Sequence, residues 1–80
     1  MFLSDPIKNE KKPSPTIALT RRQRECLQYT ADGYTGRKVA HRLGISLRMV
    51  RFHLESARQR LNASSTTQAV YLAAKSGIID

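Results

Sequence analysis

The stretch at residues 46–61, SLRMVRFHLESARQRL, predicts an amphipathic helix with two chemically distinct faces. Its apolar side chains recur at helical spacing and form one stripe that needs a core to pack against: Val50, Leu54, Ala57 and Leu61. The opposite face is polar and aromatic: Arg48, Arg51, Phe52, Glu55, Arg58 and Gln59. Arginine and glutamine can hydrogen-bond base edges or phosphates, phenylalanine can pack on a thymine methyl group, and glutamate can accept from a cytosine amine. We therefore interpret residues 46–61 as a DNA-recognition helix.

The chain carries a net charge of +8 in 80 residues, and most of that charge lies in its middle part. Residues 20–61 contain ten of the 14 lysines and arginines but three of the six acidic residues, a balance of +7. Residues 1–19 carry +1, and residues 62–80 are neutral. A basic middle segment indicates a polyanion-binding surface, although the charge alone also fits a solvated basic face without a ligand.

The composition excludes several classes of site. Cys26 is the only cysteine, so the chain has neither an internal disulfide nor a cysteine-based zinc site. No stretch reaches the roughly 18 apolar residues of a membrane span, and residues 1–16 lack the apolar core of a signal peptide. We expect a reducing, cytoplasmic location without a membrane partner. His41 and His53 have no cysteine or carboxylate at ligand spacing, so we predict no enzyme, catalytic residue, metal or cofactor.

Residues 1–18 are predicted to form a flexible linker or N-terminal arm, because Pro6, Pro13 and Pro15 remove backbone donors and favour extended neighbours. Residues 19–80 are predicted to form the folded domain.

A first helix is predicted to start with a capping box formed by Thr20 and Gln23, and to run through Asp32 until Gly33 stops it. Its predicted inner face consists of Cys26, Leu27, Thr30 and Ala31. Cys26 is therefore expected to be an inert core thiol.

A second, short helix is predicted over residues 36–43, capped by Thr35, with Val39, Ala40 and Leu43 facing inward. Gly44 then forms the turn into residues 46–61. Two helices joined by a short turn with glycine are typical of a helix-turn-helix.

A fourth helix is predicted from a second capping box, Ser65 and Gln68, to about Ser76. Its apolar residues surround the helix almost completely. Only one face of the helix can be buried in the domain, so the remaining apolar surface favours self-association. The predicted dimerisation residues are Ala69, Val70, Leu72 and Ala73. The alternative is a simple core helix. The sequence thus predicts an all-α, compact four-helix domain that contains a helix-turn-helix.

The residue pattern also resembles a known family. The matching residues are Leu19-Thr20-x-Arg22-Gln23-x-Glu25-Cys26-Leu27, Ala31-x-Gly33-x-Thr35, Val39-Ala40-x-x-Leu43-Gly44-Ile45-Ser46, Val50-Arg51-x-His53-Leu54, Leu61, Thr67-Gln68-Ala69-Val70 and Ser76-Gly77-Ile78-Ile79. In this order and spacing the chain resembles the LuxR/GerE DNA-binding domain, most closely its quorum-sensing branch. The resemblance implies a four-helix unit that binds duplex DNA, usually as a dimer formed through the last helix.

Carried over by position, the resemblance implies two sets of contacts. Phosphate contacts are implied for Thr35, Arg37 and Lys38, to which we add Ser46, as a helix N-cap, and Arg58. Contacts in or beside the major groove are implied for Arg48, Arg51, Phe52 and Glu55. Departures from the family pattern include Lys38, where glutamate is common, and Met49, where threonine is usual. A cation at the start of a helix opposes the helix dipole unless an anion binds there, so Lys38 favours DNA contact.

The predicted function is sequence-specific double-stranded DNA binding by a transcriptional regulator, with Arg51 as the main base reader and a homodimer on a palindromic site. RNA polymerase is a further candidate partner, and a small-molecule inducer is expected only if a sensory domain precedes this one. The expected location is the bacterial cytoplasm, on the nucleoid. The alternative is an interaction protein that pairs with a larger LuxR-type regulator through the last helix and blocks it; a sigma-factor helix-turn-helix fits the last helix less well.

Overall fold

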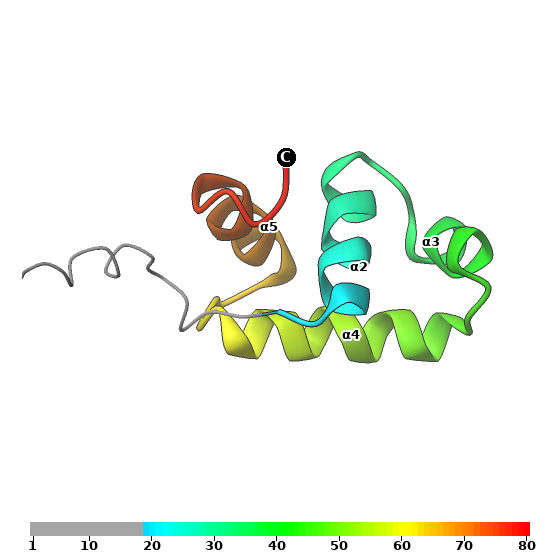
Figure 1. The fold of residues 1–80 in the computed structure, drawn as a ribbon. Coiled ribbons are helices and arrows are strands. Elements are labelled where there is room, and N and C mark those ends of the chain that lie inside the picture. The colour runs from blue at the N-terminus through cyan, green and yellow to red at the C-terminus, as the bar shows by residue number, and fades with distance from the viewer. Residues whose placement is uncertain (1–18) are drawn as a thin grey trace, which may run out of the picture.

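Three helices of the described domain are arranged around a fourth, longer one. The computed structural model describes residues 19–80, and its helices are α2 (Arg21–Ala31), α3 (Gly36–Leu43), α4 (Leu47–Arg60) and α5 (Thr66–Lys75), with no strand in that range. Figure 1 shows α2 standing on the middle of α4, with α3 near one end of α4 and α5 near the other. The predicted all-α, four-helix architecture is confirmed for these residues. The predicted linker or arm at residues 1–18 lies outside them.

Each helix begins at a hydroxyl side chain that accepts a hydrogen bond from the backbone N–H three residues later, which satisfies one of the free donors of the first turn. The four caps are Thr20, Thr35, Ser46 and Ser65. The first capping box is complete, because Gln23 Oε1 accepts from the backbone N–H of Thr20 at 3.0 Å. The second differs from the prediction, since Gln68 Oε1 accepts from the N–H of Ser64. Ser65 is more extended than the other caps, at φ −157°.

The turn between α3 and α4 depends on one left-handed residue. Gly44 lies at φ +69°, and the N–H of Ile45 reaches back to the carbonyl of Ala40 at 3.1 Å. This closure redirects the chain within two residues, so Ser46 already caps α4. The two helices also approach closely at their N-termini, where a Cβ on Gly36 would lie 3.0 Å from Leu47 Cδ1.

The core consists of two clusters, and α4 contributes to both. The cluster near the turn contains Cys26, Val39, Ala40 and Val50. The cluster near α5 contains Leu19, Leu27, Ala57, Leu61, Ala63, Ala69, Ala73 and Ile79. Leu54 packs against both. The predicted apolar stripe of α4 is therefore confirmed as its buried face.

The inner face of α2 is only partly as predicted. Cys26 and Leu27 are fully buried, and burial raises the pKa of the Cys26 thiol, as expected of an inert core residue. Ala31 is exposed, because it lies in the last turn of α2, at the end remote from α4 (Figure 1). Gln23, not predicted to be buried, is 7% exposed because its side chain folds back onto the cap.

Candidate nucleic-acid interface

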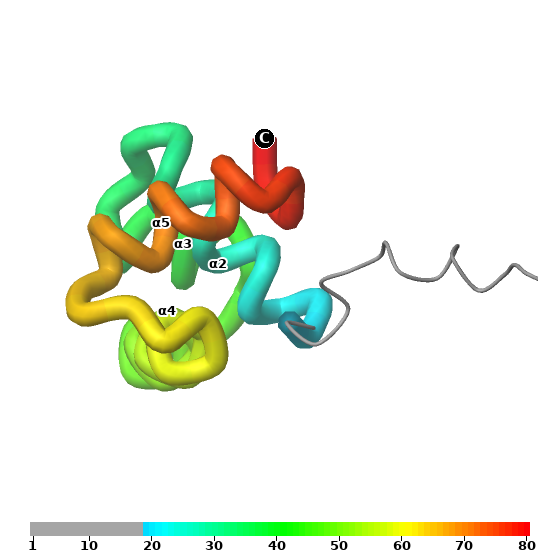
Figure 2. The backbone as a smooth tube through the Cα atoms, turned by 90° about the vertical axis from the view of Figure 1, so that its left-hand side faces the viewer, coloured from blue at the N-terminus to red at the C-terminus, as the bar shows by residue number. Residues whose placement is uncertain are grey.

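One side of α4 is left uncovered by the rest of the described chain. Figure 2, which views α4 nearly end-on, shows α2, α3 and α5 all on the same side of it. The residues exposed on α4 are Arg48, Met49, Arg51, Phe52, Glu55, Gln59 and Arg60. This set contains all four side chains predicted to read bases. None of the helices within residues 19–80 is long and apolar enough to cross a membrane.

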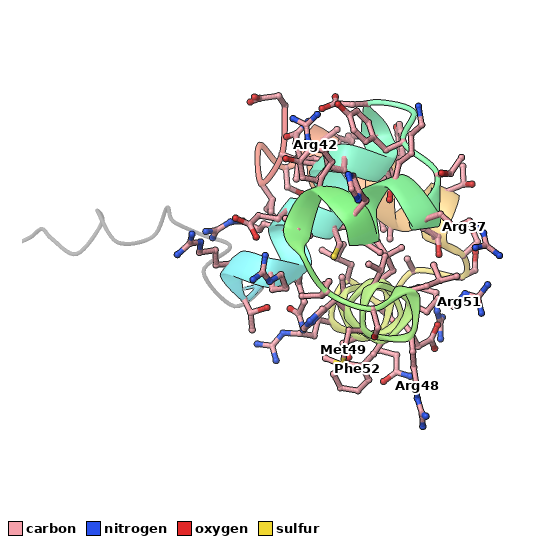
Figure 3. The ribbon with its side chains drawn as sticks, turned by 90° about the vertical axis from the view of Figure 1, so that its right-hand side faces the viewer. Arg37, Arg42, Arg48, Met49, Arg51 and Phe52 are labelled. Carbon is pink, nitrogen blue, oxygen red and sulfur yellow. The ribbon has the colours of Figure 1, made fainter. Side chains whose placement is uncertain are left out.

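Basic side chains from two helices meet at the N-terminal half of α4. Figure 3 shows Arg37 of α3 and Arg51 of α4 extending on the same side of the domain, with Arg48 below them. Between α3 and α4 lies a shallow hollow of about 500 Å³, and Thr35, Arg37 and Arg51 are among its lining residues. Within residues 19–80, no hydrogen bond or ion pair engages the side chains of Arg37, Lys38, Arg48 or Arg51. These cations are therefore free to neutralise an external polyanion.

Two N-caps lie next to this basic surface. Thr35 Oγ1 accepts from the Lys38 N–H at 3.2 Å, and Ser46 Oγ accepts from the Met49 N–H at 3.0 Å. Both hydroxyl groups keep their own proton for donation to an external acceptor, and both stand at the positive end of a helix dipole. This geometry is compatible with the phosphate contacts predicted for Thr35 and Ser46.

Arg58 and Glu55 are engaged with each other. Arg58 Nε donates to Glu55 Oε1 at 3.0 Å, and Arg58 Nη1 donates to the Ala63 carbonyl at 2.7 Å. The hydrogen bond from Arg58, followed by that from Gln59, lowers the pKa of Glu55 to about 2. Glu55 thus orients the side chain of Arg58. With the further bond from Arg58 Nη2 to Glu55 Oε2, these bonds use three of the five N–H donors of Arg58, so a phosphate contact would use the remaining two.

The predicted dimerisation residues of α5 are divided between core and surface. Ala69 and Ala73 are 0% exposed, so they cannot form a surface contact, and the prediction for these two residues is corrected here. Their small size serves close packing of α5 against α2 and α4 within one chain. Val70 and Leu72 are half-buried.

The main apolar side chain on the exposed face of α5 is Tyr71, at 59% exposure, with Lys75 Nζ lying 5.7 Å from its ring centre. Sequence reasoning omitted Tyr71 from the dimerisation set. Its position two residues after Ala69 was the available signal, because that spacing places it on the opposite side of the helix.

A second hollow contains no residue of α4 and is lined by Asp32, Gly33, Tyr34, Lys38, His41 and Arg42, so Lys38 lies on this side of α3 and does not line the hollow beside Arg51. Arg42 lies over the rings of Tyr29 and Tyr34, at 5.7 and 5.5 Å from their centres, and those rings are 4.9 Å apart. Figure 3 shows Arg42 on the side of α3 remote from Arg48 and Phe52. The two tyrosines therefore pack within the domain. Among the described residues, no group of three or more His, Cys, Asp or Glu could hold a metal ion.

Comparison with known proteins identifies the family to which this four-helix domain is similar. Residues 17–73 match the family described as bacterial regulatory proteins, luxR family (GerE). The regulatory protein SdiA of Escherichia coli (strain K12) is 35% identical over 66 residues, which cover 82% of this chain and 28% of SdiA. The transcriptional activator LuxR of Aliivibrio fischeri is 37% identical over 62 residues, covering 78% of this chain and 25% of LuxR.

Among solved structures, the transcription factor GerE superposes with a TM-score of 0.75 at 31% identity, covering 78% of this chain and 92% of GerE. The chain spans about a quarter of the length of SdiA and LuxR. LuxR is named a transcriptional activator and GerE a transcription factor, in agreement with the prediction that this domain is not an enzyme. The chain belongs to the luxR family of bacterial regulatory proteins and is a helix-turn-helix DNA-binding domain of the LuxR/GerE type.

Proposed function

We propose that this domain reads a specific DNA sequence by placing α4 in the major groove and acts as a dimer on a palindromic site. The observation that carries the proposal is the uncovered face of α4, on which Arg48 and Arg51 have no partner within residues 19–80. Arginine in such a position can bind guanine through two hydrogen bonds, which discriminates by about 1–3 kcal/mol.

The surrounding residues have different proposed tasks. Phe52 and Glu55 accompany the two arginines as base-reading residues, with Glu55 acting through the orientation of Arg58. Thr35, Arg37, Lys38 and Ser46 hold phosphates; this fixes the register of α4 and adds affinity for every sequence. Arg58 joins the phosphate set through the N–H donors that its bonds to Glu55 and Ala63 leave over.

The proposed dimer uses the exposed face of α5, around Tyr71 and the half-buried Val70. Two copies related by a twofold axis would place their α4 helices in successive major grooves. The corresponding half-sites lie roughly 10 bp apart, centre to centre.

The regulatory setting follows from the relatives. SdiA and LuxR are about four times as long as the matched region, which supports a role for this domain as the effector part of a quorum-sensing regulator in the bacterial cytoplasm. A sensory domain would then bind the small-molecule inducer, and RNA polymerase would be the partner at the promoter.

The decisive experiment is selection of bound duplexes from a random pool by the 80-residue chain at physiological salt. The expected result is enrichment of a palindrome with half-sites about one helical turn apart. Arg51→Ala should flatten the preference between sites, whereas Lys38→Ala should weaken binding to all of them alike. Arg42→Ala is the matched control for Arg51→Ala, because it removes one positive charge from the side of α3 remote from Arg48 and Phe52. Equal loss of specificity in the Arg51 and Lys38 variants would contradict the proposed roles.

The exposed face of α5 also supports a second candidate, an interaction protein that pairs with a larger LuxR-type regulator. Absence of binding to every duplex, together with a heterodimer formed through Tyr71, would favour this function over DNA reading.

A further inference from the structure

Two large apolar side chains lie exposed on the uncovered side of α4. Met49 is 41% exposed and Phe52 is 60% exposed. They are three residues apart on one helix, so their side chains are neighbours on its surface. Tyr71 of α5 is the other large hydrophobic residue that is exposed within residues 19–80. Exposed apolar groups of the described domain are therefore concentrated on the recognition helix.

Their surroundings argue against a purely apolar contact. Figure 3 shows Met49, Phe52 and Arg48 all on the side of α4 away from the other helices, with Arg51 beyond Arg48 on the side of Arg37. The Phe52 ring meets the His53 ring edge-on, with centres 5.7 Å apart at an angle of 66°. Phe52 is thus presented outward beside the exposed Arg48. A fitting ligand must offer anionic or hydrogen-bonding groups to the arginines and a small apolar group to this pair.

The DNA major groove offers this combination. Guanine presents two acceptors to arginine, and phosphates line the groove, while the methyl group on C5 of thymine is the apolar group displayed there. A methyl group on C5 of cytosine occupies the corresponding ring position. Met49 is the third residue of α4 and Phe52 the sixth, within the N-terminal part of a recognition helix that reaches base edges.

We propose that Met49 and Phe52 form a reader of pyrimidine 5-methyl groups, so that the affinity of this domain for its site depends on the methyl group of a thymine or a 5-methylcytosine. The proposal rests on the proposed function, because it requires α4 to enter the major groove. Burying one methyl group between these side chains contributes about 0.8 kcal/mol, which corresponds to about fourfold in Kd.

The test uses a duplex obtained by the selection described above. Each thymine is replaced singly by uracil, which lacks only the methyl group, and each cytosine singly by 5-methylcytosine. Kd is measured by fluorescence anisotropy at one fixed salt concentration. The natural chain should lose about fourfold in affinity at a critical thymine, or gain a similar factor at a critical cytosine. The first result identifies thymine as the source of the methyl group, and the second identifies 5-methylcytosine.

The double variant Met49→Ala, Phe52→Ala should bind the paired duplexes with equal affinity, because it has no apolar surface to bury the methyl group. Arg24→Ala is the control, since it shortens an exposed side chain of α2, outside the proposed base-reading and dimer surfaces, and should keep the methyl dependence. Met49→Leu and Phe52→Leu retain apolar side chains, so each should keep part of the dependence of Kd on the methyl group. Circular dichroism verifies that every variant is folded.

Equal affinity of the natural chain for all paired duplexes would overturn the inference, as would an unchanged methyl dependence in the double variant. These outcomes leave the proposed function standing, because a specific duplex must first have been enriched. Failure to enrich any sequence would instead overturn the proposed function, and the inference with it.

Discussion

The two ends of α4 are held in different ways. At the N-terminal end, the helix-turn-helix is defined by local devices: the caps Thr35 and Ser46, the left-handed Gly44, and one small cluster around Val39 and Val50. At the C-terminal end, α5 packs through alanines against α2 and α4. We call the N-terminal end of α4 the reading end and the C-terminal end the supporting end. The geometry of the reading end depends on short-range hydrogen bonds, which leave its outer face exposed, whereas the supporting end depends on burial of side chains.

The supporting end also contains ties between residues far apart in the chain. The backbone N–H of Asp80 donates to Gln28 Oε1 at 2.8 Å, and Ile79 is 6% exposed. Arg58 connects α4 to the turn before α5 through the Ala63 carbonyl. Mutations of buried residues at this end should therefore act mainly on stability, and mutations of exposed residues on the N-terminal half of α4 mainly on DNA binding.

The largest expected effect lies in the supporting core. Leu27→Ala should destabilise the domain by about 2–5 kcal/mol, because Leu27 is fully buried and its removal leaves a cavity. Thermal unfolding followed by circular dichroism measures the change. Arg24→Ala, on the exposed face of the same helix, should stay within about 0.5 kcal/mol of the natural chain. Comparable losses in both variants would show that α2 is not packed as described.

Substitution of two glycines should distinguish effects on stability from effects on DNA binding. Gly44 and Gly77 lie at φ +69° and +80°, and a Cβ at either position would have nothing within 4 Å. Gly44→Ala and Gly77→Ala should therefore each cost about 1–2 kcal/mol, from backbone strain alone. Urea denaturation measures this cost. DNA binding at a temperature where both variants are folded should be weakened by Gly44→Ala only, because Gly44 sets the angle of α4. Equal weakening would contradict the division between the two ends.

The two serine caps provide a matched test of phosphate contact. Aspartate caps a helix about as well as serine, so Ser46→Asp and Ser65→Asp should leave stability nearly unchanged. A negative charge at position 46 should repel a phosphate by about 1 kcal/mol, or about fivefold in Kd. The same substitution at Ser65 of α5 should have little effect. Equal Kd values for the two variants would remove Ser46 from the interface.

The smallest expected effect concerns the bond between Glu55 and Arg58. The pKa of Glu55 is lowered from 4.5 to about 2, so this interaction stabilises the fold above about pH 4.5 and loses its effect as the pH falls through 2. At pH 6 the free energy of unfolding should be slightly larger for the natural chain than for the Glu55→Gln variant. At pH 3 this difference should be smaller. Urea titrations at both pH values measure it. A difference that grows on acidification would contradict the assignment.

Much of the fold was predictable because its signals are local. Thr20, Thr35, Ser46 and Ser65 each bond to a backbone group three residues away, so the helix starts depend on residues within one turn. The outward position of Arg48, Arg51 and Phe52 followed from helical periodicity. The resemblance to the LuxR/GerE domain rested on the same closely spaced positions.

By itself, the sequence determined where the helices begin and turn, which face of α4 is buried, and where the positive charge is concentrated. The tertiary structure alone decided that Ala69 and Ala73 belong to the core while Tyr71 faces outward, and that Arg58 binds Ala63. The physical reason is the range of the interactions. Caps and turns involve neighbours along the chain, whereas α5 is apolar almost all round, and only the positions of α2 and α4 in space select which of its sides is buried.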